Sequence, residues 1–342
     1  MDRPTRQSDE LTAAVKDLAR KAGFARVRVA EAGPLRGEDA FREWLTRGWH
    51  GTMEYLARNV AKRYAPRLLV PGARSVICLA AGYGPTDDAT QYPPVALYAR
   101  GRDYHKVLAR RCQRLMDDIR RVESGFAGRV FVDSAPIAER SLAAACGVGW
   151  IGRNGCLYVP GTGSFVLLCE IVCNLALVPD EPVSARCGDC DLCVHACPTA
   201  ALSGDGLADA RRCVGYLTIE HKGRIDPELW PLMGCRIFGC DACQLACPHN
   251  HPLPPGDQEL GAVRFPPAGS GLAAMLSWTW KDWDLATRGS AVRRIGYPDF
   301  IRNAVIAAGN SGDKSLSAPL QRLLPLRPDL ADLIRWAVGA IA

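Results

Sequence analysis

Residues Cys187–Leu202, CGDCDLCVHACPTAAL, contain four cysteines separated by two, two and three residues, and Pro198 follows the last of them. Gaps of two residues allow successive thiolates to bind around one face of a cubane iron–sulfur cluster. The fourth thiolate is three residues further on and is turned away by Pro198. In proteins with two such clusters, the fourth cysteine of this pattern ligates the other cluster. The stretch therefore predicts one part of a site for two 4Fe-4S clusters.

A second cluster needs a second set of four thiolates. The stretch GCDACQLACPHN repeats the end of the pattern with Cys240, Cys243 and Cys247 but lacks its first cysteine, and Cys213 in ARRCVGYLTIE can fill that place. Eight cysteines then divide into two complete sets. The predicted ligands are Cys187, Cys190, Cys193 and Cys247 for one cluster, and Cys197, Cys213, Cys240 and Cys243 for the other.

Other uses of these thiols fit the sequence less well. Zinc sites usually show two separated C-x2-C pairs without a following C-P, and buried free thiols need no regular spacing. Cys235 is an alternative to Cys213 as a ligand. The remaining six cysteines lie in apolar or irregular contexts and are expected to be small core residues: Cys78, Cys112, Cys146, Cys156, Cys169 and Cys173.

The composition is that of an ordinary globular chain. It has 342 residues, 48% hydrophobic and 23% charged, which predicts two or three domains. The N-terminal MDRPTRQSDELTAAV lacks the apolar core of a signal peptide, and no stretch reaches the roughly 18 apolar residues of a membrane span. We therefore expect a cytoplasmic protein whose fifteen cysteines serve metal or redox chemistry. A net charge of +6 permits a nucleic-acid partner without demonstrating one.

The first 180 residues alternate helical and extended patterns. DELTAAVKDLARKAG predicts a helix capped by Asp9 and ended by Gly23, and ARVRVAEAG predicts a strand. Buried strands are expected at SVICLAAGY and GRVFVDSAP, with the helix HKVLARRCQRLMDDIRRV between them. CLYVPGTGSFVLLCEIVCNLAL predicts two strands that turn at residues 160–163. The pattern indicates an α/β fold.

The C-terminal third has a different character. HPLPPGDQELGAVRFPPAGSG is rich in proline and glycine and predicts a linker or an irregular wrap. YPDFIRNAVIAAGNSG and RPDLADLIRWAVGAIA predict two amphipathic helices, which we expect to form a small helical-repeat cap. The second helix carries an apolar face formed by Leu330, Leu333, Ile334, Ala337, Val338 and Ile341.

Two iron–sulfur clusters pass electrons singly and need little more chain than their motifs occupy. The rest of the chain is therefore expected to use the electrons. It contains no G-x-G-x-x-G after a strand and no G-x-x-x-x-G-K-[ST]. A second cofactor must be held in another way.

Three N-terminal stretches offer polar groups to a ligand. VFVDSAPIAER places Asp133 just past an apolar strand, where burial would raise its pKa and keep a proton available near neutral pH; alternatively, Asp133 caps the next helix. GWIGRNG either offers backbone amides or turns a corner. YARGRDYHKVLA either grips a polar ligand or is a solvated loop, and it contains Tyr98, Arg100, Arg102, Asp103, Tyr104 and His105.

In order and spacing, nine blocks along the whole chain resemble the epoxyqueuosine reductases: GTMEYLARN, YARGRDYHK, VDSAPIAER, GWIGRN, GSFVLLCE, CGDCDLCVHACPTAAL, ARRCVGYLTIE, RIFGCDACQLACPHN and GSAVRRIGYPDFIRNAVIAAGNSG. The resemblance implies a multidomain fold of mixed α/β and α+β type. It divides the chain into a cobalamin-binding α/β domain (1–180), a ferredoxin-like domain with two 4Fe-4S clusters (181–255) and a HEAT-like helical segment that binds tRNA (256–342). The family removes the epoxide oxygen from epoxyqueuosine at the tRNA wobble position, the last step of queuosine synthesis.

The resemblance also implies residue roles. Asp133 matches the family's proposed proton donor, and Tyr104, His105 and Glu220 are expected beside the substrate. The implied cobalamin contacts are Arg58, Asp133, Asn154, Leu168, Gly215 and Asp241. The chain departs from the family pattern in having Arg153 for the usual Lys, Cys169 for Gly and Gly215 for a frequent Ser, and it is short after the last helices.

The chemistry of the implied reaction agrees with the predicted cofactors. Converting an epoxide to an alkene consumes two electrons and two protons and releases water, and reduced cobalt accepts electrons in single steps. An external electron donor is required, and a monomer with no membrane contact is expected. Two other classes are a cobalamin-dependent reductive dehalogenase or similar reductase, which typically carries a twin-arginine export signal absent here, and an electron carrier, which leaves the N-terminal domain unexplained.

Two groups of basic residues are candidates for tRNA contacts, because phosphate binding relies on Lys and Arg. A solvated surface is the alternative for both. One group is Arg293, Arg294 and Arg302, and the other is Arg211, Arg212, Lys222 and Arg224.

Overall fold

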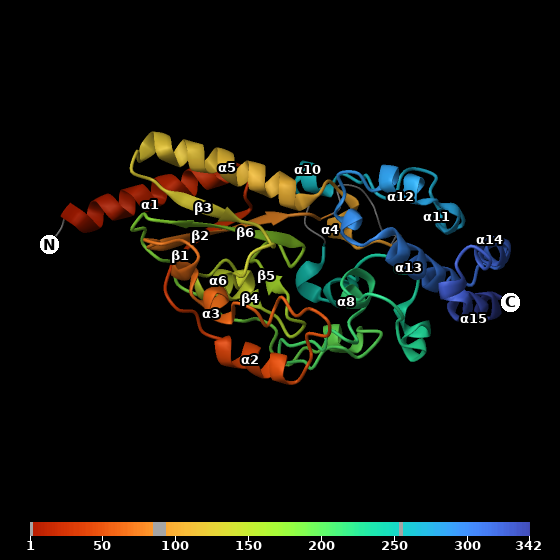
Figure 1. Ribbon diagram of the computed structural model, residues 1–342. Coiled ribbons are helices and arrows are strands. Elements are labelled where there is room, and N and C mark those ends of the chain that lie inside the picture. The colour runs from red at the N-terminus through yellow and green to blue at the C-terminus, as the bar shows by residue number, and fades with distance from the viewer. Residues whose placement is uncertain (1–2, 85–93, 253–255) are drawn as a thin grey trace.

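The computed structural model describes residues 3–84, 94–252 and 256–342 (Figure 1). A four-stranded sheet in the order β1-β2-β6-β3 forms the centre of the N-terminal part, and each neighbouring pair in it is antiparallel. A separate two-stranded sheet pairs β4 with β5. The strands are β1 (Arg26–Glu31), β2 (Ser75–Gly82), β3 (Gly128–Phe131), β4 (Trp150–Ile151), β5 (Leu157–Tyr158) and β6 (Val166–Cys173).

Helices cover both faces of the main sheet (Figure 1). On one face lie α1 (Arg3–Lys21) and α5 (Tyr104–Val122), and on the other lie α3 (Val60–Tyr64) and α6 (Glu139–Ala145). Successive residues of β2 alternate between the two resulting cores, with Ile77 and Leu79 in one and Val76 and Cys78 in the other. This explains why β2 is a continuous apolar run, as predicted. Two short helices, α2 (Glu38–Thr46) and α4 (Leu97–Arg100), complete this part.

The predicted helices and strands of this part are present, with one boundary corrected. Helix α1 begins at Arg3 rather than after Asp9, so Asp9 lies inside the helix and is not its cap. Pro4 stands in the first turn, where a proline is tolerated because its missing N–H has no helical partner. Gly23 follows the helix with φ of +88°, as a terminating glycine should.

The cysteine-rich segment (residues 187–248) contains the short α-helices α7 (Leu192–His195), α8 (Val214–Ile219) and α9 (Ala242–Leu245). Helices α7 and α9 pack against each other. The two C-x2-C-x3-C-P stretches run through these two helices, so their packing brings the two stretches together.

The proline-rich stretch after the cysteines is an ordered wrap where the structure describes it. Residues 253–255 lie outside the described part. Helix α10 (Gln258–Gly261) packs on α4 and α5, and the amides of Arg264 and Phe265 donate to the carbonyl of Arg100 at 2.7 and 2.9 Å. Phe265 is fully buried. The wrap therefore fastens the C-terminal helices to the N-terminal part.

The remaining helices are α11 (Leu272–Ser277), α12 (Trp280–Ala286), α13 (Tyr297–Gly309), α14 (Ser317–Leu323) and α15 (Ala331–Ile341). Both helices predicted here are present as α13 and α15, and four of the six apolar residues predicted for the second helix are buried. The predicted amphipathic character of α13 is wrong, because every residue from Phe300 to Gly309 is buried. Helix α13 packs against α11, α12, α15 and α8. In the described ranges, no helix combines the length and apolar character needed to span a bilayer.

Helix α13 is tied to the cysteine-rich segment by a buried polar network. The Asn303 side-chain amide donates to the carbonyls of Thr218 and Ile237 at 2.8 and 2.9 Å. The Arg302 guanidinium, only 3% exposed, donates to the carbonyls of Leu217, His221 and Gly223. Arg302 was expected to contact tRNA, and this expectation is wrong because these internal bonds occupy its guanidinium.

Candidate active site

Asp133 lies two residues past the end of β3, as predicted, and has a left-handed backbone with φ of +57°. Its Oδ2 atom accepts a hydrogen bond from the Tyr104 hydroxyl at 2.7 Å and lies 2.9 Å from Nε2 of His105. Tyr104 and His105 are the first two residues of α5. The Asp103 carboxylate caps α5 by accepting from the His105 amide, and its Oδ1 lies 2.8 Å from His105 Nδ1. The imidazole is thus held between two carboxylates.

These contacts reverse the expected titration of Asp133. The hydrogen bond from His105 holds the pKa of the Asp133 carboxyl below its usual value, against the opposing effect of burial, and the Tyr104 hydroxyl adds to the lowering. Burial acts to lower the pKa of His105, but the hydrogen bonds to Asp103 and Asp133 outweigh it and raise the pKa. The predicted rise in the pKa of Asp133 is therefore wrong, and the resting proton belongs to His105. The alternative that Asp133 caps the next helix is also wrong, since the N-cap residue of α6 is Ala138.

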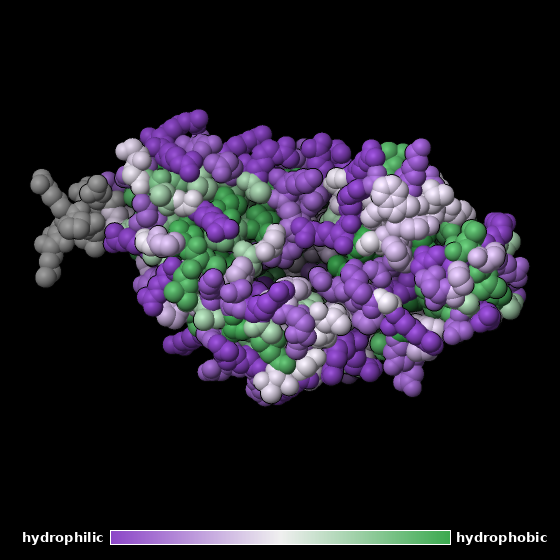
Figure 2. Space-filling view, viewed as in Figure 1, coloured by the Kyte–Doolittle hydropathy of each residue, from purple (hydrophilic) through white to green (hydrophobic). Residues whose placement is uncertain are grey.

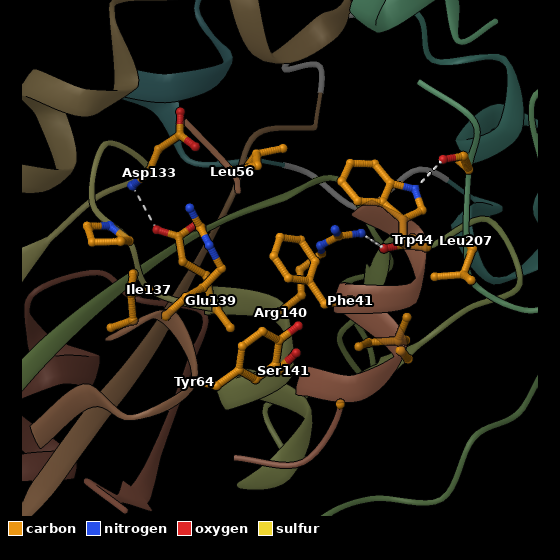
Figure 3. A pocket seen from close by; sticks show the side chains of 18 of the residues that line it. Phe41, Trp44, Leu56, Tyr64, Asp133, Ile137, Glu139, Arg140, Ser141 and Leu207 are labelled. Carbon is orange, nitrogen blue, oxygen red and sulfur yellow. Dashed lines mark hydrogen bonds between the residues drawn. The ribbon is translucent and has the colours of Figure 1, made fainter. Parts of the chain in front are cut away.

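Asp133 stands where two cavities meet. The larger, of about 920 Å³, is lined by aromatic side chains of α2 and α3 and by residues of the Asp133 loop (residues 132–138) and of α6 (Figure 3). The smaller, of about 550 Å³, is lined by Tyr98 and Tyr104 together with residues of α8. Asp133, Glu220 and Arg294 line both cavities. A ligand in either cavity would therefore reach the Asp133 carboxylate.

The other residues predicted for this site divide between the cavities and the core. Arg58 and Asn154 line the larger cavity, and Gly215 lines the smaller one. Leu168 and Asp241 do not line either cavity. Leu168 packs on the core beneath α6, and Asp241 is buried and accepts from the Leu97 amide at 2.7 Å. Burial raises the pKa of Asp241.

Several residues that line these cavities were not predicted as site residues. Glu139 follows Asp133 by six residues and lines the larger cavity with Arg140, Phe41, Trp44 and Tyr64 (Figure 3). Glu139 and Arg140 lay within a quoted motif, VDSAPIAER, and their spacing from Asp133 was the available signal. The aromatic residues come from a separate helical pattern that resembles an ordinary amphipathic surface.

Of the basic residues predicted to contact tRNA, two reach a cavity. Arg294 lines both cavities, and its charge helps to lower the pKa of Asp133. Lys222 lines the smaller cavity and pairs with Asp299 at 3.0 Å. Arg293 instead forms an ion pair with Asp284. The charge pattern alone did not separate these roles.

The four thiols predicted for one cluster line a single cavity of about 150 Å³. Cys187, Cys190, Cys193 and Cys247 surround it with Asn154, Tyr158 and His249 among the neighbouring side chains. Four thiols around one small cavity are the donor set that a 4Fe-4S cluster requires. Asn154 also lines the larger cavity, so it stands between this cysteine cavity and the candidate active site.

The second predicted set also lies together. Cys213 interacts electrostatically with Cys197 and Cys243, and Cys240 interacts with Cys213 and Cys243. Within the described ranges, no three Cys, His, Asp or Glu side chains converge on a point that would hold one metal ion. A four-iron cluster needs no such point, because each thiolate binds a different iron.

Two other cysteines clarify the assignment. Cys235 is exposed and its charged neighbour is Arg236, so it is placed less favourably than Cys213. Cys156 was expected to be an ordinary core residue, yet its thiol forms a hydrogen bond with that of Cys243. It therefore lies directly beside the second set.

The thiol sets and the carboxylate between two cavities define an iron–sulfur oxidoreductase. Residues 186–250 match the family model "4Fe-4S double cluster binding domain", and residues 63–134 match "Epoxyqueuosine reductase QueG, DUF1730". An epoxyqueuosine reductase of Alicycliphilus denitrificans is 41% identical, over 97% of this chain and 98% of that protein. The chain belongs to the epoxyqueuosine reductase family.

Solved structures of the family have the same fold. A crystal structure of epoxyqueuosine reductase with an epoxyqueuosine-modified tRNA-Tyr stem loop superimposes with a TM-score of 0.83 at 27% identity, covering 97% of this chain and 90% of that one. A Bacillus subtilis structure, described as having its catalytic aspartate loop swung out of the active site, gives a TM-score of 0.83 at 26% identity, covering 97% and 91%.

Proposed function

We propose that this protein reduces the epoxide of epoxyqueuosine in a tRNA to the alkene of queuosine. Family membership supports the reaction, and a relative was crystallised with the modified stem loop. The observation that carries the proposal is Asp133, held by Tyr104 and His105 where two cavities meet. The reaction takes two electrons and two protons and releases the epoxide oxygen as water.

The proposed cofactors are two 4Fe-4S clusters and cobalamin. Two 4Fe-4S clusters would be held by the two sets of four cysteines named above, and an external donor would supply their electrons. Cobalamin would occupy space at the meeting point of the cavities, with Arg58, Asn154 and Gly215 as contacts. Leu168 and Asp241 lie outside the lining of both cavities. The corrin-bound cobalt supplies reactivity toward the epoxide that single-electron clusters lack. The cavity volumes of about 920 and 550 Å³ fit the occupants, a large cofactor and a nucleoside.

The chain's own residues supply and hold the proton. In the resting site His105 is the cationic partner and Asp133 the carboxylate, so Asp133 would deliver a proton to the departing oxygen only after taking it from His105 at Nε2. Asp103, at Nδ1, stabilises the charged imidazole and fixes its orientation. Tyr104 and Glu220 would contact the nucleoside from the smaller cavity. The catalytic loop of the Bacillus subtilis relative is described as swung out of its active site. This supports the proposal that the Asp133 loop can move.

We divide the chain into three segments: 1–180 for cobalamin and catalysis, 181–255 for the clusters, and 256–342 as a HEAT-like helical segment that helps to bind tRNA. Packing of the sheet with its helices supports the first segment, and the packing of α13 and α14 against α15 supports the last. Arg294 is the C-terminal residue best placed to contact the substrate, since it lines both cavities.

The direct test is a turnover assay. Holoenzyme with reconstituted clusters and cobalamin is mixed anaerobically with a chemical reductant and tRNA that carries epoxyqueuosine. Nucleosides are then identified by mass spectrometry. Appearance of queuosine with loss of one oxygen mass is expected, and its failure to appear with fully loaded enzyme would refute the proposal.

A further inference from the structure

The amide of Asp133 is fastened to a second carboxylate. Its N–H donates to Oε1 of Glu139 at 2.7 Å, and Glu139 is the first residue of α6 (Figure 3). Asp133 has φ of +57°, a region that non-glycine residues adopt only when their surroundings hold them there. A hydrogen bond from an amide to a carboxylate is among the stronger ones available for this purpose. Glu139 therefore restrains the backbone that aims the Asp133 carboxylate.

Glu139 in turn rests against a buried partner. Glu170 lies in the middle of β6, is 1% exposed, and forms a hydrogen bond with the Glu139 side chain. Its Oε2 atom has no hydrogen-bond partner among the described residues. The titratable groups with the largest effects on its pKa, or that respond to its charge, are acidic groups and thiols, namely Glu139, Cys78, Cys112, Cys146 and Cys169.

Ionising a carboxyl group that is buried among acidic groups and thiols is costly, so Glu170 keeps its proton. Burial raises the pKa of Glu170 well above its usual value. Burial also raises the pKa of Glu139, to about 7, and the charge of Asp133 adds to the rise. The Glu170 O–H can then donate to Glu139, which leaves the Glu139 carboxylate to accept from Asp133.

We propose that Glu139, backed by Glu170, is a positioning residue that holds the Asp133 loop (residues 132–138) where its carboxylate meets Tyr104 and His105. The inference rests on the proposed function, in which Asp133 delivers the proton. In this role Glu139 acts through the Asp133 backbone and not on the reacting atoms. Its contribution is to the orientation of Asp133, and small errors of orientation reduce catalytic rates strongly.

The first test is Glu139→Ala in the holoenzyme with epoxyqueuosine-bearing tRNA. We expect the single-turnover rate constant to fall at least about 10-fold with little change in tRNA affinity. Hydrogen exchange of the Asp133 amide should accelerate at least about 10-fold in the cofactor-free chain, which probes the restraint without catalysis. Asp313→Ala is the matched control, because Asp313 also accepts from a backbone amide, that of Ser315 at 2.9 Å, in a turn of the C-terminal segment. It should leave both readouts unchanged.

The second variant, Glu139→Gln, keeps an oxygen that can accept from Asp133 but cannot become a carboxylate. The groups that face Glu139 are Asp133, Glu170, Arg63, Arg140 and Cys169. At pH 8 the parent's Glu139 is ionised, and the variant should be about 2- to 5-fold slower. At pH 6 Glu139 is largely protonated, so the ratio of the two rates should approach one.

The outcomes separate the inference from the proposed function. Unchanged exchange at the Asp133 amide in Glu139→Ala would overturn the positioning role, whatever the activity. If that variant does not fold, Glu139→Gln is the deciding variant. The positioning role is overturned if this variant matches the parent at pH 8 both in hydrogen exchange of the Asp133 amide and in the single-turnover rate constant. Accelerated exchange, together with full activity of Asp133→Asn, would retain the restraint and reject Asp133 as the acid.

Discussion

Nε2 of His105 lies 2.9 Å from Oδ2 of Asp133, although 28 residues separate the two in the chain. The pair joins the first turn of α5 to the loop after β3. It also sets the charge of the candidate acid, because His105 lowers the pKa of Asp133 while Asp133 helps to raise that of His105.

Asp133→Asn should reduce turnover by about 100-fold or more while cobalamin still binds, because the amide keeps the shape of the side chain but cannot relay a proton. Single-turnover epoxide reduction followed by mass spectrometry measures the rate, and the absorbance of the bound corrinoid measures loading. Near-normal reduction in this variant would reject the acid role.

The His105–Asp133 pair should give a pH-dependent stability. The raised pKa of His105 contributes stability below its usual value of 6.5, lost as pH rises through the folded value. The lowered pKa of Asp133 contributes stability above its usual value of 3.8, lost as pH falls through the folded value. Denaturant unfolding of the parent and His105→Gln should therefore differ most between about pH 4 and 6.5 and converge above that window. A difference that grows toward pH 9 would contradict this charge assignment.

Anaerobic analysis should find about eight irons per chain in the parent. Cys213→Ser should weaken or remove one cluster, whereas Cys235→Ser should leave both, because Cys213 interacts with Cys197 and Cys243 while Cys235 is exposed beside Arg236. Loss of iron in the Cys235 variant alone would transfer the ligand role to Cys235.

Arg294→Ala should weaken tRNA binding and lower the salt slope of binding by about one unit, as expected for one lost phosphate contact. Arg293→Ala is the natural control, because the adjacent guanidinium already pairs with Asp284. Binding measured at several salt concentrations distinguishes the two. Equal slopes for the parent and the Arg294 variant would show that Arg294 has another role.

Arg302→Met should leave that salt slope unchanged but lower the free energy of unfolding by about 3 kcal/mol or more, because it strands buried carbonyls of Leu217, His221 and Gly223. Denaturant unfolding measures the loss. A stable variant with weakened tRNA binding would restore the surface role first expected for Arg302.

The parts of the site that local spacing determines could be predicted from the sequence. Most of the candidate cysteine ligands were chosen from gaps of two and three residues, whereas Cys213 was added to complete the second set. The place of Asp133 depends on the end of one strand. Titration could not be predicted, because the groups that lower the pKa of Asp133 come from α5 and from Arg294, far along the chain. Charge also says nothing of burial, so Arg294 and Arg302 appeared equivalent although one lines the cavities and the other is 3% exposed.

For the fold as well, the features set by local sequence could be predicted and those set by distant contacts could not. Hydrophobic periodicity predicted the helices and strands, since each reflects its own contacts with a core. The antiparallel order β1-β2-β6-β3 depends on pairings between distant segments, such as Val76 with Val172, and no local pattern specifies them. The start of α1 was missed because the first helical turn carries no apolar periodicity.

The hydrogen bonds from Arg302 and Asn303 to the backbone around α8 determine which fragments of this protein can fold. The carbonyls of Leu217, Thr218 and Ile237 have their partners in a helix more than 60 residues further along the chain. A fragment ending before Tyr297 would carry those carbonyls without partners, so we expect the cysteine-rich segment not to fold stably on its own. A shortened or fused protein that keeps the cysteine-rich segment must therefore also keep α13, or must supply other groups that donate to these carbonyls.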